Sequence, residues 1–432
     1  MIGYYSTRDP QKNKVSFADA LLKGLAPDGG LYVPDAIPQV NPAVWLEAPS
    51  VADLGVEVLG AWLGDEIPAG QLEAVVRDAL NFPTPVVRLS DDLFVLELIH
   101  GPTLSFKDYG ARTMARLMQY FLSSRGERRV ILVATSGDTG SAVADGFAGQ
   151  DNIEVVLLYP KGKVSTVQER QLIVERPGVR SFAVEGDFDD CQRMVKEAFV
   201  DPGLADLPLS SANSINIGRL LPQSLYYLWA ANRLHSLTGG SEINFCVPSG
   251  NLGNLTGGIF AALVGQPVHR FVAAHNANDF FPNYLAHSAE AFEFRPTVAT
   301  VSNAMDVGAP SNFERLHHLL SEERARGWIW GTSVHNADTL GRMKAVYDQF
   351  GYVACPHTSV GLEAVHRYRQ ATGDPTPFVT LACAHPAKFP EAVSQTLGIP
   401  APTERALEAL FSRPVRVETI APTLAALRER LT

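Results

Sequence analysis

Short apolar runs recur along the chain from residue 93 onward, and each has the length of a single strand. They lie at residues 93–99, 130–134, 153–159, 243–247, 271–274 and 378–382. Longer segments with helical spacing of apolar residues separate them. Strands that are apolar on both faces and alternate with helices are typical of parallel sheets. The pattern therefore predicts an α/β fold with mostly parallel sheets flanked by helices.

The first 85 residues follow a different pattern. Apolar residues recur at helical spacing in residues 16–25, 45–63 and 71–80, and no strong strand pattern interrupts them. The sequence NFPTP at 81–85 is typical of a boundary, because proline disfavours both helix and strand continuation. We therefore expect residues 1–85 to form a separate, mainly helical N-terminal segment.

Two of the predicted strands run directly into glycine-rich turns that open helices. The turns are TSGDTG at 135–140 and PSGNLGN at 248–254. This repetition predicts two α/β lobes, at residues 86–235 and 236–432. Ligands of α/β folds bind at the carboxyl ends of the strands, so we expect a shared cleft there.

Composition narrows the class of protein. A chain of 432 residues is about three times a typical ~150-residue domain, which favours two or three domains. The 46 acidic residues outnumber the 36 basic ones, which argues against a nucleic-acid-binding protein. No apolar run reaches the ~18 residues of a membrane-spanning helix, and the first residues lack the apolar core of a signal peptide. We expect a soluble, cytoplasmic enzyme with a small-molecule substrate, no nucleic-acid or membrane partner, and a monomeric or homodimeric state.

The cysteines and histidines do not predict a metal site. The four cysteines are far apart and form no C-x-x-C pair, and the histidines lack H-E-x-x-H spacing. We therefore expect neither a disulfide framework nor a metal centre. Cys383 ends the last predicted strand, where a buried core thiol is the ordinary interpretation.

Lys107 lies at the start of a predicted helix in the segment HGPTLSFKD. Apolar residues between 114 and 122 recur at helical spacing, and Ser105 with Asp108 is typical of a capping pair. Lys107 is then in the first turn, where the helix dipole disfavours a cation. A lysine that forms a Schiff base must attack as the neutral amine, so this position favours such chemistry. The alternative is a lysine that extends to water, with its charge offset by Asp108.

The two glycine-rich turns favour different anions. A turn that opens a helix offers free N–H groups and a positive dipole end. TSGDTG contains Asp138, which would repel a phosphate, so a carboxylate held by Ser136 and Thr139 fits it better. GNLGN, at 250–254, has no acidic residue and is the better phosphate cradle. Neither turn matches the P-loop or the dinucleotide fingerprint, and either could be a tight connection only.

A further group of donors lies in SSANSINIGRLLPQ. Asn213, Ser214 and Asn216 surround a possible helix start, and Arg219 follows them. An arginine can bind an anion with two parallel hydrogen bonds. The alternative is a capped helix with no ligand.

Taken together, these motifs resemble the threonine synthase family, in the longer form found in bacteria and fungi. The resemblance implies the pyridoxal-phosphate fold of tryptophan synthase β, with two α/β lobes and the cofactor between them. It also implies conversion of O-phospho-L-homoserine and water to L-threonine and phosphate, by γ-elimination and β-addition of water. The segments that carry it are YYSTRD, SFADALLKGLAPDGGLYVP, HGPTLSFKD, SGDTG, NSIN with Arg219, and GNLGN.

The resemblance assigns roles toward the pyridoxal 5'-phosphate cofactor. Lys107 would carry the cofactor as a Schiff base and move protons, and Asp138 would lie near its 3-hydroxyl. Cys383 stands where the family usually has Ser or Thr beside the pyridine nitrogen, and a thiol is a weaker donor. The residues implied to hold the cofactor phosphate are Gly250, Asn251, Leu252, Gly253 and Asn254.

The resemblance also assigns the substrate contacts. Ser136 and Thr139 would bind the substrate carboxylate, and Asn213, Ser214 and Arg219 the phosphate that leaves. A phospho-lyase or an amino-acid dehydratase of the same fold is the nearest alternative, and the predicted phosphate contacts argue against a dehydratase. A binding protein without catalysis is a more distant one, because it would not need Lys107.

Overall fold

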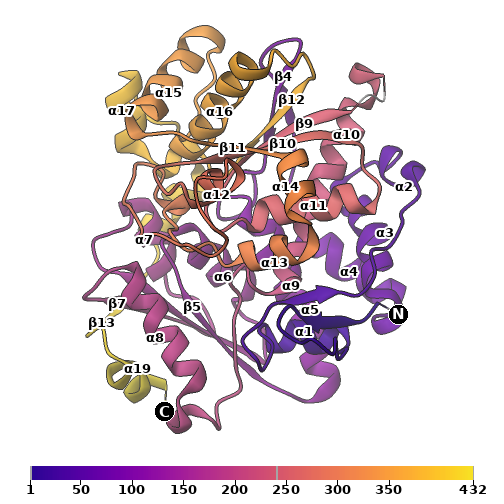
Figure 1. Cartoon of the computed structure of the whole chain (residues 1–432). Coiled ribbons are helices and arrows are strands. Elements are labelled where there is room, and N and C mark those ends of the chain that lie inside the picture. Colours follow the sequence, from indigo (N-terminus) through magenta and orange to yellow (C-terminus); the bar gives the residue numbers. More distant parts are fainter. Residues whose placement is uncertain (1, 240–241, 432) are drawn as a thin grey trace.

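The computed structural model describes residues 2–239 and 242–431, and two largely parallel sheets dominate it (Figure 1). The larger sheet has the strand order β11-β10-β9-β12-β4-β3. All its neighbours pair in parallel except β3 with β4. The strands are β3 (Val86–Arg88), β4 (Leu93–Glu97), β9 (Ile243–Pro248), β10 (Val268–His275), β11 (Ile329–Ser333) and β12 (Phe378–Ala382).

The smaller sheet has the order β13-β7-β6-β5-β8, and all its pairs are parallel. Its strands are β5 (Arg129–Ala134), β6 (Ile153–Pro160), β7 (Val179–Val184), β8 (Leu209–Ser210) and β13 (Glu418–Ile420). The α/β class with parallel sheets is therefore confirmed. All six apolar runs form strands, within a few residues of their predicted bounds.

The sheets do not follow the predicted division of the chain at residue 236. Strand β4 pairs with β12 in the larger sheet, with Leu93 opposite Phe378. Strand β13 returns to the smaller sheet beside β7. Each sheet is thus built from separated stretches, whereas the sequence predicted one continuous stretch for each lobe. Parallel pairing joins strands that are distant in sequence, so local patterns cannot reveal this exchange.

Helices cover the outer faces of the sheets and fill the space between them. Helices α8 and α19 pack near the smaller sheet, and α15, α16 and α17 lie on the far side of the larger one (Figure 1). The helices are α1 (Phe17–Lys23), α2 (Pro42–Leu46), α3 (Val51–Leu63), α4 (Ala69–Ala79), α5 (Lys107–Arg125), α6 (Asp138–Phe147), α7 (Thr166–Ile173), α8 (Phe188–Val200), α9 (Ile217–Leu220), α10 (Ser224–Thr238), α11 (Gly253–Val264), α12 (Phe280–Leu285), α13 (Asn312–Leu319), α14 (Glu322–Trp328), α15 (Asn336–Phe350), α16 (Pro356–Thr372), α17 (Pro390–Leu397), α18 (Arg405–Ser412) and α19 (Leu424–Leu431).

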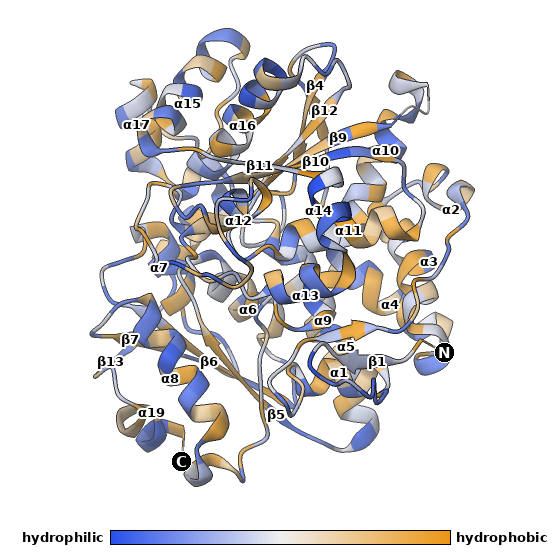
Figure 2. Ribbon diagram, in the orientation of Figure 1, coloured by the Kyte–Doolittle hydropathy of each residue, from blue (hydrophilic) through white to orange (hydrophobic). Residues whose placement is uncertain are grey.

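One hydrophobic core is shared by the inner faces of both sheets. In β5, Ile131 and Val133 point into this core, whereas Leu132 points to the outer face under α8. This alternation follows the two-residue period of a strand. Phe245 of β9 joins the same inner core. Figure 2 shows hydrophobic positions along β4 and β12 and alternating positions on the surrounding helices.

The N-terminal segment is mainly helical, as predicted, but one predicted helix is two. Residues 45–63 contain the end of α2 and all of α3, because α2 ends at Leu46 and α3 begins at Val51, after its N-cap residue Ser50. The Ser50 side chain accepts a hydrogen bond from the Asp53 amide and caps α3. Strand β1 (Tyr4–Ser6) pairs antiparallel with β2 (Tyr32–Pro34), which the sequence did not reveal.

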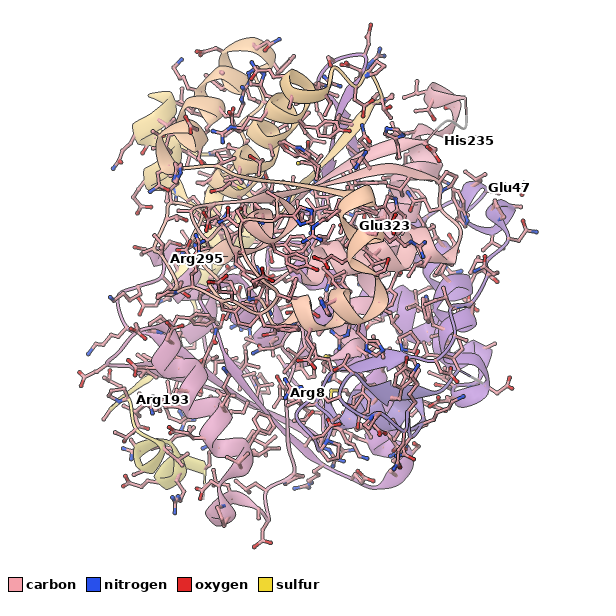
Figure 3. All side chains as sticks on the ribbon, viewed as in Figure 1. Arg8, Glu47, Arg193, His235, Arg295 and Glu323 are labelled. Carbon is pink, nitrogen blue, oxygen red and sulfur yellow. The ribbon has the colours of Figure 1, made fainter. Side chains whose placement is uncertain are left out.

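The N-terminal segment also contacts the second half of the chain. The Arg8 guanidinium, labelled in Figure 3, forms two hydrogen bonds with the carboxylate of Glu314 on α13. The Thr7 hydroxyl donates to the same carboxylate at 2.5 Å. Among the described residues, no helix has the length and apolar character needed to cross a bilayer.

Candidate active site

A cavity of about 1110 Å³ lies where strands of both sheets end. Its wall includes the turn after β5 and the turn after β9. All the residues to which the resemblance assigns a cofactor or substrate contact line this cavity: Lys107, Ser136, Asp138, Thr139, Asn213, Ser214, Arg219, Gly250, Asn251, Leu252, Gly253, Asn254 and Cys383. The fold therefore brings the nominated residues together, at the strand ends where α/β folds bind ligands. Their individual roles stay predictions.

Helix α5 begins at Lys107, two residues after the predicted start at Ser105. The predicted capping pair is wrong, because Asp108 turns back to the preceding turn. Its carboxylate accepts hydrogen bonds from the Thr103 amide at 2.9 Å and the Thr103 hydroxyl at 2.6 Å. Gly101 leaves the space, since a Cβ there would lie 2.4 Å from Asp108 Oδ2. Lys107 still occupies the first turn, as predicted.

Lys107 is enclosed by the cavity wall. Its side chain is 13% exposed, and its Nζ lies 3.9 Å from Asp138 Oδ2. Burial lowers the pKa of Lys107 below its ordinary value; Asp138 opposes this shift and Lys388 adds to it. The enclosed side chain disagrees with the alternative in which Lys107 extends to water. A lysine with a lowered pKa can act as an amine nucleophile and as a base.

The TSGDTG turn is held by Thr135, which the sequence analysis did not single out. Its hydroxyl accepts hydrogen bonds from the amides of Gly137 at 3.0 Å and Gly140 at 2.8 Å. Gly137 has a φ of 127°, which a residue with a side chain rarely adopts. The turn leaves Ser136 and Thr139 partly exposed in the cavity wall.

Asp138 opens α6 and is almost fully buried. Its Oδ1 lies 2.7 Å from Lys388 Nζ and accepts a hydrogen bond from Gln168 Nε2 at 3.0 Å. Burial would raise the pKa of Asp138, but Lys388 and then Lys107 hold it below its usual range. The carboxylate is therefore an anion directed at Lys388, which agrees with the expectation that it does not meet a phosphate.

The GNLGN turn connects β9 to α11. Gly250 must be a glycine, because a Cβ there would lie 2.8 Å from the Met305 Cα. Leu252 adopts a left-handed φ of 60°, and α11 begins directly after it at Gly253. The Asn251 side chain donates to Ser214 Oγ at 2.7 Å, which links this turn to the NSIN segment.

Asn254 leaves a buried donor without a partner. Its Oδ1 accepts hydrogen bonds from the hydroxyls of Tyr226 at 2.6 Å and Tyr227 at 2.8 Å. Its Nδ2 has no hydrogen-bond partner among the described residues, although the residue is 5% exposed. An unpaired amide donor in the first turn of the 12-residue helix α11 fits an anion such as a phosphate.

The NSIN segment serves both as a helix cap and as a cavity wall. Asn216 caps α9, accepting a hydrogen bond from the Gly218 amide. Asn213, Ser214 and Arg219 line the cavity. Ser214 Oγ accepts hydrogen bonds from the side-chain amides of Asn251 and Asn312, so it already has two partners within the protein.

Arg219 is a buried cation that forms no ion pair among the described residues. Nη1 donates to the Ala212 carbonyl at 2.6 Å, whereas Nε has no partner among the described residues. No carboxylate in the described part of the chain lies within ion-pair distance of it. Burial lowers the pKa of Arg219 to about 10 and the nearby Asp108 carboxyl opposes this shift, so the guanidinium stays charged near neutral pH.

Cys383 follows β12 and lines the cavity while packing into the shared core. Its Sγ lies 3.6 Å from the Leu381 carbonyl oxygen, and burial raises the pKa of the thiol well above its usual value. The residue is therefore a neutral thiol at the cavity wall. Both the core interpretation and a contact with a ligand are compatible with this position.

Sequence reasoning missed two titratable residues next to the nominated ones. Lys388, in the short 3₁₀ helix Pro386–Lys388, is fully buried against Asp138. His357 lines the cavity, and burial lowers its pKa to about 4. Its Nε2 accepts a hydrogen bond from the Ala304 amide at 3.1 Å, so the ring is neutral and fixed. His357 lies in none of the motifs, and Lys388 lies five residues after Cys383 in a segment from which the sequence analysis singled out only the cysteine.

The described residues contain no group of three or more His, Cys, Asp and Glu side chains placed to hold a metal ion. The four cysteines are buried and free.

Three families of known proteins match the chain. The family described as pyridoxal-phosphate dependent enzyme matches residues 78–384, the threonine synthase N terminus matches 3–80, and the threonine synthase C-terminal part matches 358–430. The chain belongs to the threonine synthase family. Lys388 lies beyond the first of these matches and inside the threonine synthase C-terminal match.

Similar proteins of this family cover the chain from end to end. The threonine synthases of Haemophilus influenzae and Escherichia coli are 39% and 40% identical, and the alignments cover 98–99% of each chain. The crystal structure of the Escherichia coli threonine synthase has a TM-score of 0.91 and covers 100% of this chain and 99% of that chain at 37% identity. The PLP-bound threonine synthase from Brucella melitensis also has a TM-score of 0.91, at 35% identity, and covers 100% of this chain and 99% of that one.

Membership in the threonine synthase family establishes the class of chemistry. The chain is a pyridoxal-phosphate-dependent lyase, as the resemblance of its motifs implied. The residues present fit the cofactor, because a nucleophilic lysine and an unpaired donor at a helix N-terminus line one cavity.

Proposed function

We propose that this chain converts O-phospho-L-homoserine and water to L-threonine and phosphate. The observation that carries the proposal is Arg219, a buried cation that forms no ion pair among the described residues, in the same cavity as Lys107. A buried charge that lacks a partner destabilises a protein by several kcal/mol. The phosphate of the substrate would supply an ion-pair partner, whereas a substrate without a phosphate would not.

We assign cofactor binding to two parts of the cavity. Lys107 attaches pyridoxal phosphate covalently, and residues 250–254 hold its phosphate, with Asn254 Nδ2 as one donor. When bound, the cofactor supplies the electron sink that makes protons on the substrate carbon atoms acidic. Asp138 and Cys383 complete the proposed cofactor contacts, near the 3-hydroxyl and the pyridine nitrogen.

The chain's own residues orient the substrate and move its protons. Ser136, in the turn after β5, and Thr139, in the first turn of α6, hold the carboxylate. Lys107, once free as an amine, removes the Cα proton and then a Cβ proton; its lowered pKa supports this role.

Departure of the phosphate depends on the donors of the NSIN segment and Arg219 in the cavity wall. Asn213, Ser214 and Arg219 bind the phosphate and align the Cγ–O bond, which breaks as the phosphate leaves. Charge-assisted contacts that strengthen as negative charge develops on the leaving group favour this step over simple binding. Cγ is then protonated to a methyl group, water adds at Cβ, and return of a proton to Cα from Lys107 completes threonine.

A cytoplasmic location and a monomeric or homodimeric state are part of the same proposal. Fractionation of the native cells and light scattering of the purified protein test these two points.

The test of the reaction is a product balance. The purified chain is loaded with pyridoxal phosphate and given O-phospho-L-homoserine, and threonine, phosphate and 2-oxobutyrate are measured together. We expect threonine and phosphate in equal molar amounts. Phosphate with 2-oxobutyrate would identify a phospho-lyase instead. Consumption of threonine or serine, with phosphohomoserine left intact, would identify a dehydratase.

A further inference from the structure

Lys388 is a second lysine beside the proposed catalytic one, and it is completely enclosed. Its side chain is 0% exposed, and its Nζ lies 2.7 Å from Asp138 Oδ1 and 2.9 Å from the Thr103 carbonyl oxygen. Asp138 lines the cavity, whereas Lys388 does not and contacts Asp138 from the protein interior. A lysine is rarely buried in this way unless it is paired, and here the pairing is direct.

The two lysines share one carboxylate unequally. Lys388 Nζ contacts Asp138 Oδ1 at 2.7 Å, whereas Lys107 Nζ is 3.9 Å from Oδ2. Gln168 Nε2 also donates to Oδ1 and fixes the carboxylate on the Lys388 side. The ion pair of Asp138 with Lys388 is therefore the stronger of the two, because charge-assisted hydrogen bonds form below about 3 Å.

Other titratable groups also surround this pair: Asp108 and His385 lie near Lys388, and burial raises the pKa of Asp108 to about 6 but lowers the pKa of His385. His357 also faces Asp138, and it is neutral near pH 7 because burial lowers its pKa to about 4. Besides Asp138 and Lys388, Lys107 faces Arg219, a cation, and Cys383, a thiol whose pKa is raised by burial. Asp138 is thus the one ionised acid that faces Lys107 among the described residues.

We propose that Lys388 is a positioning residue, which binds the Asp138 carboxylate so closely that Lys107 is left without a strong counter-ion and keeps a reactive amine. The inference rests on the proposed role of Lys107. It predicts opposite effects for the two partners of the pair. Loss of the Lys388 charge frees Asp138 to stabilise the Lys107 ammonium, whereas loss of the Asp138 charge leaves Lys107 facing a second cation.

The direct test measures the pKa of Lys107 by competitive labelling. The full-length chain is freed of cofactor and acetylated with trace reagent at a series of pH values, and each lysine is quantified by mass spectrometry. Lys161, which is half exposed, serves as the internal reference. We expect Lys388→Met to raise the pKa of Lys107 by roughly one unit or more, and Lys388→Arg to keep it near the wild-type value.

Asp138→Asn provides a second variant if Lys388→Met does not fold. It should lower the pKa of Lys107, and the double variant Asp138→Asn/Lys388→Met should return it toward the wild-type value. An unchanged Lys107 pKa in either folded single variant would overturn the proposal, since the pair would then have no electrical effect on Lys107.

The holoenzyme gives a second readout. The pH at which the cofactor absorbance changes should move upward in Lys388→Met and stay in place in Lys388→Arg. A fixed transition in both variants also counts against the proposal. If the wild type makes no threonine, the proposed function fails, but the labelling experiment still measures the coupling of Lys388 to Lys107. If the wild type makes threonine and the Lys107 pKa does not move, only the inference about Lys388 fails.

Discussion

Lys107 and Arg219 are both enclosed basic residues in one cavity, but their surroundings favour different chemical roles. Lys107 faces a carboxylate that another lysine binds more closely, and its pKa is lowered. Arg219 has no carboxylate within ion-pair distance in the described part of the chain, and its pKa of about 10 keeps it charged. A lysine that loses its proton easily can act as a nucleophile and base. An arginine that stays charged can bind a phosphate.

Replacing Lys107 by alanine should abolish turnover while the fold is kept. Loss of a covalent catalyst that also moves protons should lower the rate at least ~10³-fold, because proton transfer alone contributes roughly 10²–10⁴-fold. Circular dichroism of the variant checks its folding. Borohydride reduction of the wild-type holoenzyme, followed by peptide mapping, should place the cofactor on Lys107. A label on any other lysine would defeat the assignment.

Arg219→Ala should reduce turnover of phosphohomoserine much more than any side reaction on threonine or serine. A charge-assisted contact contributes ~1.5–3 kcal/mol, which corresponds to roughly a 10- to 100-fold loss in kcat/KM. Because both reactions are measured in the same variant, a loss of folded enzyme lowers both rates equally and does not change their ratio. Equal losses in both would mean that Arg219 has a structural role only.

Substitutions of Cys383 test which side chain controls protonation of the cofactor's pyridine nitrogen. Cys383→Ser keeps a small neutral donor and should retain most activity. Cys383→Asp places an anion where the resemblance puts the pyridine nitrogen, and such a contact raises a nitrogen pKa by roughly a unit or more. We expect an altered cofactor spectrum and slower threonine formation in this variant. If Cys383→Asp folds with an unchanged spectrum and rate, Cys383 is a core thiol only.

At the scale of single elements, the sequence predicted turns and helix starts better than it predicted their hydrogen bonds. The two strand–turn–helix units and the first-turn position of Lys107 follow from local patterns, and the structure has them. The capping pair of Ser105 and Asp108 does not form, because Asp108 bonds to Thr103. A side chain that can cap a helix can also turn to a nearby backbone amide, and the sequence does not rank these options.

The turn after β9 can be tested through its unpaired donor. Asn254→Asp keeps an oxygen for the hydroxyls of Tyr226 and Tyr227 but replaces the Nδ2 donor by an anion. The affinity for pyridoxal phosphate should fall roughly 10- to 100-fold, because a hydrogen bond to a charged group is lost and repulsion is added. Equilibrium titration of the cofactor measures this loss.

Asn152→Asp is the matched control, since it adds the same charge at a residue that does not line the cavity. Its cofactor affinity should equal that of the wild type. A folded Asn254→Asp protein with wild-type affinity would show that the cofactor phosphate binds elsewhere.

At the scale of the whole molecule, two sheets exchange strands, and the candidate active-site cavity lies where strands of both sheets end. Strand β4 joins the sheet of β9 and β12, and β13 joins the sheet of β5 to β8. The class of fold and the location of the cavity follow from repeated strand–turn–helix units, but this exchange does not, because parallel pairing has no local signature. Lys388 escaped prediction for the same reason, since its partner Asp138 lies far away in the sequence and meets it only in the folded chain.

The central claim is that this cavity breaks the carbon–oxygen bond of its substrate and adds water to a different carbon. Running the reaction on O-phospho-L-homoserine in ¹⁸O-labelled water, with mass spectrometry of both products, tests it most directly. The account predicts threonine that carries one labelled oxygen in its hydroxyl group, and phosphate that carries none. Labelled phosphate together with unlabelled homoserine would contradict it, because water would then have attacked phosphorus and the carbon–oxygen bond would have stayed intact.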